Sequence, residues 1–197
     1  MTCTDVTLED CLRADLYGLL ANLLSVPPGN RRLSQLVRLE GDSSALGLAV
    51  SQLAKAVEKA MPDEVAEEYN ALFIGVSCGE VVPYASFYLM GSHEHPLTML
   101  RQDMVRLGIV RTEGIAESED HISSLFEMMR GLIEGTFVPP AGPAIQSDVF
   151  LSHIAPWAGR FFDDLETAPS AQLYRAIGAV GSRFMAIEIE AMNRIGH

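Results

Sequence analysis

The chain has 197 residues, which is enough for one domain with a sizeable hydrophobic core. Apolar residues make up 48% of it and charged residues 20%, a balance that excludes extended disorder. The net charge is −12, from 14 basic and 26 acidic residues. A nucleic-acid-binding protein is therefore not expected, because phosphate contacts need clustered lysine and arginine. The acidity favours a basic partner, or serves only to keep the protein in solution.

The cysteines and the hydropathy of the chain further narrow the class of protein to which it can belong. The three cysteines, Cys3, Cys11 and Cys78, have neither metal-site spacing nor the pattern of a disulfide framework. The first residues lack a basic segment followed by an apolar one, so no secretory signal is predicted. No apolar stretch of about 18 residues exists to span a membrane. The cytoplasm is the expected compartment.

Apolar residues at spacings of three and four predict helices along the first half of the chain. The first carries Leu8, Leu12, Leu16, Leu19, Leu20 and Leu23, and Pro27-Pro28-Gly29 ends it. Residues 33–37 and 46–57 predict two more helices, separated near Gly41-Asp42. Pro62 is a favourable first residue for a helix that continues to Phe73.

The second half repeats this pattern and contains a break. Apolar spacing predicts a helix over residues 97–107, and a stronger one over 122–133 for which Ser118 is the expected N-cap. Proline and glycine from Gly135 to Pro143 cannot continue a helix and predict a hinge. The stripe over residues 150–165 is interrupted by Pro156, where we expect a kink. Residues 173–187 form the last long predicted helix.

These elements predict an all-α protein, a single helical bundle domain over residues 1–197 with about 9–11 helices. The proline- and glycine-rich stretch divides it into a first lobe of residues 1–134, a hinge of 135–146 and a second lobe of 147–197. Such a hinge permits either a monomer or a domain-swapped dimer.

Several catalytic and cofactor motifs are missing. The sequence has no phosphate loop, no dinucleotide fingerprint, no nucleophile elbow and no HExxH zinc motif. No cofactor, metal or catalytic residue is therefore predicted. A metal-dependent helical hydrolase that uses His93, His95 and His121 is the alternative, and a general helical adaptor is another.

Large aromatic residues gather beside glycine and proline turns between residues 69 and 88. Tyr69, Leu72 and Phe73 share one helical face, and the helix can end at Gly75. Such clusters can line a groove that receives an apolar peptide, although core packing explains any single member. Asp120-His121 opens the strongest helix, where capping is the simpler explanation. The candidate client-binding residues are Tyr69, Leu72, Phe73, Gly75, Pro83, Tyr84, Ser86, Tyr88, Asp120 and His121.

The order of these blocks resembles a known family. Tyr69-x-x-Leu72-Phe73-x-Gly75, then Pro83-Tyr84-x-Ser86-x-Tyr88, then Glu119-Asp120-His121 is similar to the TorD- and DmsD-like redox-enzyme maturation chaperones, which are related to NarJ. The later block His153-Ile-x-Pro156-Trp157 agrees as well. The resemblance covers roughly residues 8–190.

The resemblance implies an all-α, cytoplasmic, non-catalytic chaperone. Members bind the twin-arginine signal peptide or the apo form of a molybdopterin oxidoreductase until cofactor insertion and folding are complete. By this resemblance Tyr69, Leu72, Phe73 and Tyr84 would contact the apolar part of the leader. Asp120 would attract its basic end, and His121 would add a hydrogen bond and pH sensitivity.

Overall fold

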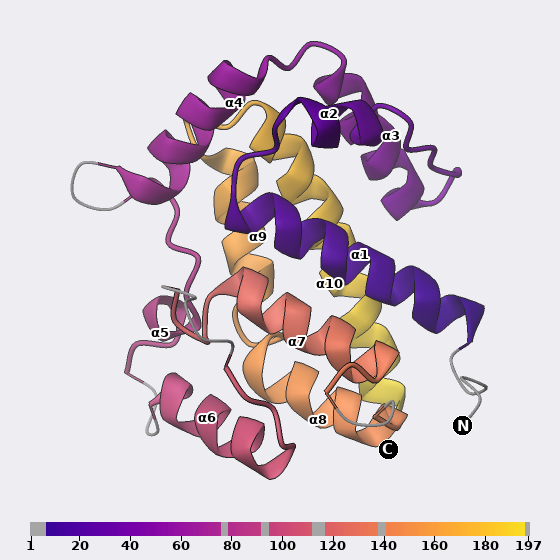
Figure 1. The fold of residues 1–197 in the computed structure, drawn as a ribbon, viewed down its shortest axis with the longest axis vertical. Coiled ribbons are helices and arrows are strands. Elements are labelled where there is room, and N and C mark those ends of the chain that lie inside the picture. Colours follow the sequence, from indigo (N-terminus) through magenta and orange to yellow (C-terminus); the bar gives the residue numbers. More distant parts are fainter. Residues whose placement is uncertain (1–6, 76–78, 92–94, 112–116, 138–140, 196–197) are drawn as a thin grey trace. The chain divides into compact units, whose positions relative to one another are not determined.

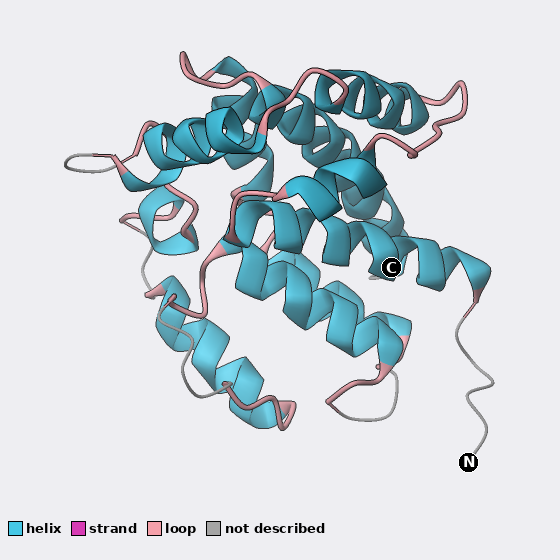
Figure 2. Ribbon diagram, turned by 45° about the horizontal axis from the view of Figure 1, so that its top comes forward, coloured by secondary structure: helices cyan, strands magenta, loops and turns pink. Residues whose placement is uncertain are grey.

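Helices account for all the regular structure in the described residues of the computed structural model, which are 7–75, 79–91, 95–111, 117–137 and 141–195. This part of the chain contains ten α-helices and one π-helical turn but no β-strand (Figures 1 and 2), which confirms the all-α prediction. None of these helices combines the length and apolar content that a membrane span requires. The elements are α1 (Leu8–Ser25), α2 (Asn30–Leu36), α3 (Ala45–Val57), α4 (Pro62–Tyr69), the π-helical turn η1 (Asn70–Ile74), α5 (Ala85–Tyr88), α6 (Pro96–Arg106), α7 (Ile122–Glu134), α8 (Pro143–His153), α9 (Ala158–Thr167) and α10 (Leu173–Ile195).

Local sequence explains where most of these helices begin and end. Three of them, α4, α6 and α8, start at a proline, which needs no hydrogen-bond partner for its nitrogen in the first turn. Ser44 caps α3, because its hydroxyl accepts a 3.0 Å hydrogen bond from the Gly47 amide. Gly135 ends α7 with a φ of +75°, a conformation that favours glycine.

Two predicted helix boundaries are wrong. The helix expected to start after Ser118 starts at Ile122, and its N-cap is His121, whose side chain accepts from the Ser123 amide. The stripe with an expected kink at Pro156 is two helices, α8 and α9, separated by a turn. The amides of Ile154 and Ala155 both donate to the Phe150 carbonyl, which closes α8 before the proline.

The chain divides into two compact units, each assembled from separate segments. Unit 1 comprises residues 1–22, 84–157 and 188–197, and unit 2 comprises residues 23–83 and 158–187. The predicted hinge at 135–146 connects α7 and α8, which both belong to unit 1, and residues 138–140 lie outside the described part. The two lobes on either side of that hinge therefore stay a prediction.

Unit 1 is built on helices α7 and α8, which pack side by side (Figure 1). Its core contains a buried ion pair: the Arg13 guanidinium donates to Glu188 through Nε at 2.8 Å and Nη2 at 2.9 Å. The Tyr17 hydroxyl donates to the same carboxylate at 2.8 Å. Burial would lower the pKa of Arg13, but the hydrogen bonds and charge of Glu188 raise it above its ordinary value. This network joins α1 to the C-terminal half of α10.

Unit 2 packs its helices around large apolar side chains. Within this unit α2 lies against α3. Glycine allows a neighbouring side chain to approach the helix backbone closely, where any larger residue would not fit. A Cβ at position 181 would lie 2.1 Å from the Phe162 ring, so the ring occupies the space that Gly181 leaves. The buried side chains of this unit include Leu23, Leu24, Leu33, Leu36, Leu53, Val57, Val65, Leu72, Phe161, Phe162, Leu165, Tyr174, Ile177, Val180 and Phe184.

Candidate functional site

In unit 2 the predicted aromatic residues form a cluster with a residue from α10. The ring centroids of Tyr69 and Phe73 are 5.0 Å apart, and those of Phe73 and Tyr174 are 5.4 Å apart. The hydroxyls of the two tyrosines donate to the last carbonyls of α1, Tyr69 to Ser25 and Tyr174 to Leu23, each at 2.9 Å. The cluster therefore supplies hydrogen-bond donors to carbonyls of the last turn of α1, which have no partner within the helix. Tyr69 and Phe73 stay half-buried, and each keeps some surface exposed.

A π-helical turn follows Tyr69 and redirects the backbone. The Gly75 amide donates to the Asn70 carbonyl at 2.8 Å, five residues back, and Gly75 has a φ of +51°. The Leu72 carbonyl is left to accept from the Val81 amide at 2.9 Å. A Cβ at Gly79 would lie 2.2 Å from that carbonyl oxygen, so this close approach needs glycine. The Leu72 side chain is fully buried, so it supports the turn from within the core.

Glu68 precedes this motif and was not predicted as a functional residue. Its buried carboxylate accepts hydrogen bonds from the amides of Gln172 at 2.7 Å, Leu173 at 3.1 Å and Tyr174 at 2.7 Å. These are the amides of the residue before α10 and of its first two residues, which have no partner within the helix. A carboxylate here also complements the positive end of the helix dipole. Glu68 thereby ties α4 to the start of α10.

In unit 1 the two predicted segments around Tyr84 and Asp120 lie together. The Ala85 amide donates to the Asp120 carbonyl at 3.1 Å, and the Ser86 amide donates to the Asp120 carboxylate at 2.9 Å. The rings of Tyr84 and His121 pack edge to face, with centroids 5.0 Å apart. Four of the ten predicted residues therefore lie in contact with one another in unit 1. They are Tyr84, Ser86, Asp120 and His121.

Asp120 is only 2% exposed, and its charge is satisfied from within the protein. Burial raises the pKa of its carboxyl, but hydrogen bonds from Ser118 and Ser86 outweigh this and hold the pKa below its ordinary value. The carboxylate thus holds the segment of residues 84–86 against that of residues 118–121. This is a positioning role within the protein, and direct contact of Asp120 with a basic leader stays a prediction.

His121 is buried and serves as a helix cap. Its Nδ1 accepts from the Ser123 amide at 3.1 Å and lies 2.6 Å from the Ser123 hydroxyl. Burial lowers the pKa of the imidazole, although the charges of Glu117 and Asp120 act in the opposite direction. The cap requires the neutral ring, because a protonated Nδ1 cannot accept a hydrogen bond.

The capping histidine should make stability depend on pH. Because the pKa of His121 is lower in the folded than in the unfolded protein, the unfolded state binds the proton first as the pH falls below about 6.5. We expect the free energy of unfolding to decrease from about pH 7.5 to about pH 5.5. His121→Asn, which caps without titrating, should lose this dependence, whereas the exposed control His95→Asn should keep it. Urea unfolding at both pH values measures the difference, and parallel behaviour of wild type and His121→Asn would contradict it.

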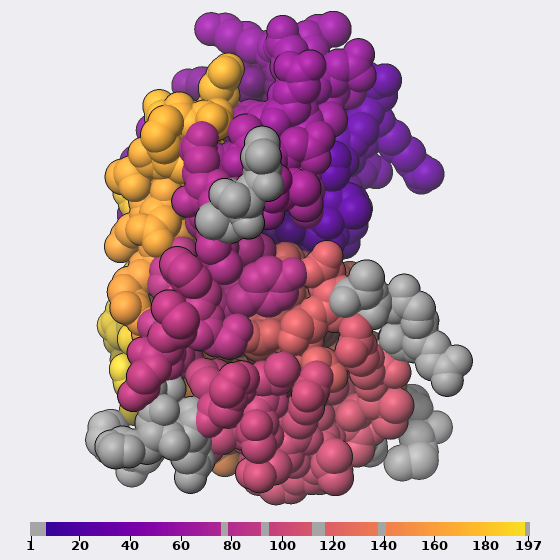
Figure 3. All heavy atoms as spheres, turned by 90° about the vertical axis from the view of Figure 1, so that its left-hand side faces the viewer, coloured from indigo at the N-terminus to yellow at the C-terminus, as the bar shows by residue number. Residues whose placement is uncertain are grey.

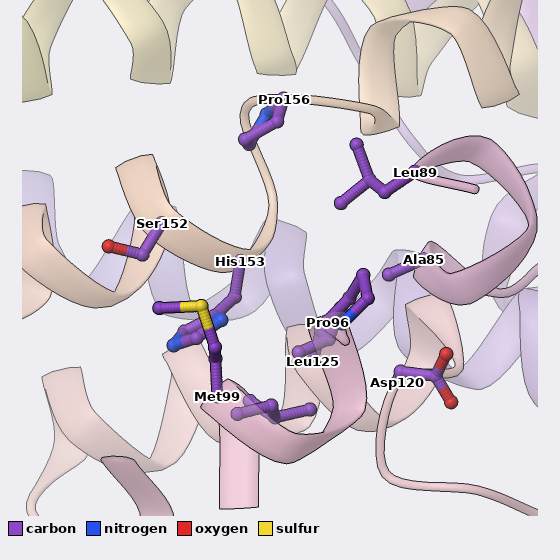
Figure 4. A pocket seen from close by; sticks show the side chains of 10 residues that line it. Ala85, Leu89, Pro96, Met99, Asp120, Leu125, Ser152, His153 and Pro156 are labelled. Carbon is purple, nitrogen blue, oxygen red and sulfur yellow. The ribbon is translucent and has the colours of Figure 1, made fainter. Parts of the chain in front are cut away.

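An open cavity of about 340 Å³ lies beside Ala85 and Asp120 within unit 1 (Figure 4). Helices α5, α6 and α8 supply most of its wall, and α5 and α6 lie next to each other on the surface (Figure 3). Most of the exposed lining is apolar. The lining residues are Ala85, Leu89, Pro96, Met99, Leu100, Asp120, Leu125, Ser152, His153 and Pro156.

His153 and Ser152 are the polar residues on the α8 side of this cavity, and His153 is the buried one. Its Nε2 lies 2.8 Å from an Asp103 carboxylate oxygen, which links α8 to α6. The His153 carbonyl accepts from the Trp157 indole at 2.8 Å, and the Trp157 ring stacks on Tyr88 with centroids 5.4 Å apart. Tyr88, a predicted site residue, therefore packs against the turn after α8. Pro156 in that turn lines the cavity.

The histidines of the alternative metal site do not form a cluster in the described residues. His121 is buried, His95 is exposed, and His93 lies outside the described part. Within the ranges that the structure describes, no group of three or more histidine, cysteine, aspartate or glutamate side chains could hold a metal ion.

The family model of the nitrate reductase delta subunit matches residues 39–163. The chain belongs to the nitrate reductase delta subunit family. This is the NarJ-related family of redox-enzyme maturation chaperones, so the resemblance inferred from the sequence is confirmed. No curated protein sequence matches this chain.

A solved structure shares the fold of this delta subunit family member. It is a protein from Archaeoglobus fulgidus assigned as a redox enzyme maturation protein, with a TM-score of 0.60 and 19% sequence identity. The similarity covers 89% of this chain and 94% of the other. At this identity the comparison shows a common fold.

The range matched by the delta subunit family contains every predicted client-binding residue. Five of them belong to unit 2 and five to unit 1. The unit 2 group is Tyr69, Leu72, Phe73, Gly75 and Pro83, and the unit 1 group is Tyr84, Ser86, Tyr88, Asp120 and His121. Glu68 and the cavity residues of α6 and α8 also fall in this range, but none of them is among the predicted client-binding residues.

Proposed function

We propose that this chain is a cytoplasmic chaperone that binds the twin-arginine leader, or the apo form, of a molybdopterin oxidoreductase. It holds this client until the cofactor is inserted and folding is complete. The family assignment supports the maturation role. The observation that carries the finer proposal is the open apolar cavity beside Asp120 in unit 1, because a leader contains an apolar segment that such a cavity can accept.

The positions of the predicted residues suggest a division of roles. Leu72 and Asp120 are buried and would organise the surface, whereas Tyr84 is half-buried and can contact a client. Phe87 and Met90, which follow it in and after α5, are 45% and 75% exposed. A flexible methionine beside an aromatic ring is suited to clients of varying sequence. We propose that these side chains contact the client together with Tyr84.

Calorimetry with a synthetic twin-arginine leader tests the proposal. We expect a dissociation constant in the micromolar range, about −8 kcal/mol. Replacing both arginines of the peptide with glutamine should weaken binding several-fold at low salt and less at high salt, because the acidic protein attracts the basic segment. A peptide of the same composition in scrambled order is the control. Failure to bind any leader, together with failure to retain an apo-molybdoenzyme in a pull-down, would refute the proposal.

A further inference from the structure

Two arginines of unit 1 bind one glutamate, the residue directly before Asp120. The Arg101 guanidinium on α6 donates two hydrogen bonds to the Glu119 carboxylate, from Nε at 3.2 Å and from Nη2 at 2.9 Å. The Arg111 Nη1 lies 3.8 Å from the same carboxylate, and its Nη2 donates to the Glu117 carbonyl at 2.9 Å. One carboxylate therefore has two cationic partners from its own chain.

The arginines lie on the solvent side of this contact. The side chains of Arg101 and Arg111 are 54% and 40% exposed, whereas the Glu119 side chain is 12% exposed. The hydrogen bond from Arg101 holds the pKa of the Glu119 carboxyl below its ordinary value, although burial acts in the opposite direction. The group is therefore a carboxylate at neutral pH, and a basic residue that approaches from outside meets two guanidinium groups first.

The contact adjoins the surface that the proposed function gives to the client. The hydroxyl of Tyr84, a proposed client contact, donates to the Glu117 carboxylate. Glu119 is the neighbour of Asp120, whose own carboxylate is buried and bonded within the protein. Arg101 belongs to α6, the helix that also forms part of the cavity wall. The arginines are thus placed where a basic segment of a bound client would pass.

Basic residues are scarce in this unit. By sequence, the segments of unit 1 contain 15 acidic and 6 basic residues, a net charge of −9. Two of these six bases contact the Glu119 carboxylate, beside the proposed client surface. The contact is also weak enough to be displaced, because an ion pair between exposed side chains changes an equilibrium constant by no more than about fivefold.

We infer that Arg101 and Arg111 form an autoinhibitory contact, in which they occupy Glu119 as internal substitutes for the basic residues of a client. The inference rests on the proposed function and adds a means of regulation to it. An arginine of the client can make the same bidentate hydrogen bonds and so replace Arg101. Because every basic segment must first displace the internal arginines, the contact lowers the affinity for all of them. A client that also fills the apolar cavity then binds in preference to other basic segments.

Removing the two arginines tests the inference through a gain of affinity, which a folding defect does not produce. In calorimetry at low salt, we expect Arg101→Gln combined with Arg111→Gln to bind a synthetic twin-arginine leader about three- to tenfold more tightly than the wild type. A leader in which glutamine replaces both arginines should bind the two proteins equally. No gain for the arginine leader, or an equal gain for both leaders, would overturn the inference.

A charge-matched variant distinguishes this contact from general attraction. Arg106→Gln combined with Arg130→Gln also removes two partly exposed arginines from unit 1, and it releases the carboxylates of Asp103 and Glu134. Both double variants change the net charge by the same amount, so diffuse attraction increases in both. We expect the control variant to gain about twofold at most. A gain as large as that of the first double variant would show that net charge alone is responsible, against the inference.

Glu119→Gln supplies a second, independent measurement. It removes the charge that Arg101 and Arg111 cover, so substituting these arginines in this background should raise the affinity by about twofold at most, as in the charge-matched control. Such non-additivity is the signature of residues that act on one another. The full three- to tenfold gain in the Glu119→Gln background would contradict the inference. Circular dichroism and unfolding midpoints verify that all variants are folded.

The outcomes separate this inference from the proposed function. If the wild type and the first double variant bind a twin-arginine leader equally well, the autoinhibitory contact is wrong and the proposed function stands. If neither protein binds any leader or apo-enzyme, the proposed function fails and the inference falls with it.

Discussion

Glu188→Ala is expected to lower the free energy of unfolding by about 3–5 kcal/mol, the cost of breaking a buried ion pair from one side. The substitution leaves the Arg13 guanidinium, whose side chain is 14% exposed, without its bidentate partner. It also removes the carboxylate that accepts a hydrogen bond from the fully buried Tyr17 hydroxyl. The loss reflects these broken hydrogen bonds of buried groups more than the attraction between the two charges. Urea unfolding monitored by circular dichroism measures it.

Two controls test whether the loss of stability comes from the buried network or from a general sensitivity of α10 to substitution. Glu190→Ala removes an exposed carboxylate that pairs with Arg194 on the same helix, and should cost less than about 0.5 kcal/mol. Combining Glu188→Leu with Arg13→Met and Tyr17→Phe removes both buried charges and the tyrosine hydroxyl together, although the Gln146 side-chain oxygen loses Arg13 as a donor. This triple variant should recover part of the stability, because no buried charge remains unpaired. A triple variant as unstable as Glu188→Ala would contradict the account.

Glu68→Ala is expected to cost about 3 kcal/mol, the second-largest effect. Three amides at the start of α10 lose their acceptor, and two of them belong to the buried residues Leu173 and Tyr174. Losing a helix cap costs about 0.5–2 kcal/mol, and hydrogen bonds to a charged group contribute about 1.5–3 kcal/mol. The favourable interaction of the carboxylate with the helix dipole is lost as well. Thermal or urea unfolding measures the change.

The neighbouring Glu67 provides the control for this prediction. It lies on the same helix and is exposed, so Glu67→Ala should change stability by no more than about 0.5 kcal/mol. Glu68→Gln keeps one acceptor oxygen but loses the charge, and we expect an intermediate loss. Equal effects of Glu68→Ala and Glu67→Ala would show that the three hydrogen bonds do not stabilise the protein.

Periodicity along the chain determined the fold class and most of the helices. Leucines at spacings of three and four predicted α1, in which Leu20 and Leu23 are buried while Leu8 and Leu12 are exposed. The pattern of residues 122–133 matches the buried side of α7. These features are predictable because the period of a helix is a local property of the backbone. The family is also readable from sequence, since the order of its short blocks is a property of the chain alone.

The hydrogen-bond partners of the polar residues were decided by the tertiary structure. Asp120 resembled a helix-start residue or a ligand for a basic leader, yet its carboxylate accepts from the Ser86 amide, 34 residues away. Glu188 accepts from Arg13 across 175 residues. No spacing rule predicts such pairs, because they depend on which helices pack together.

The sequence by itself thus determined an all-α chain of a chaperone family, and it predicted a client-binding site that includes Tyr84 and Asp120-His121. Only the tertiary structure decided that Asp120 and His121 are buried supports and that the open space beside them is the cavity formed by α5, α6 and α8. The physical reason is that helical periodicity specifies which face is buried, whereas a cavity arises where neighbouring elements fail to fill the space between them.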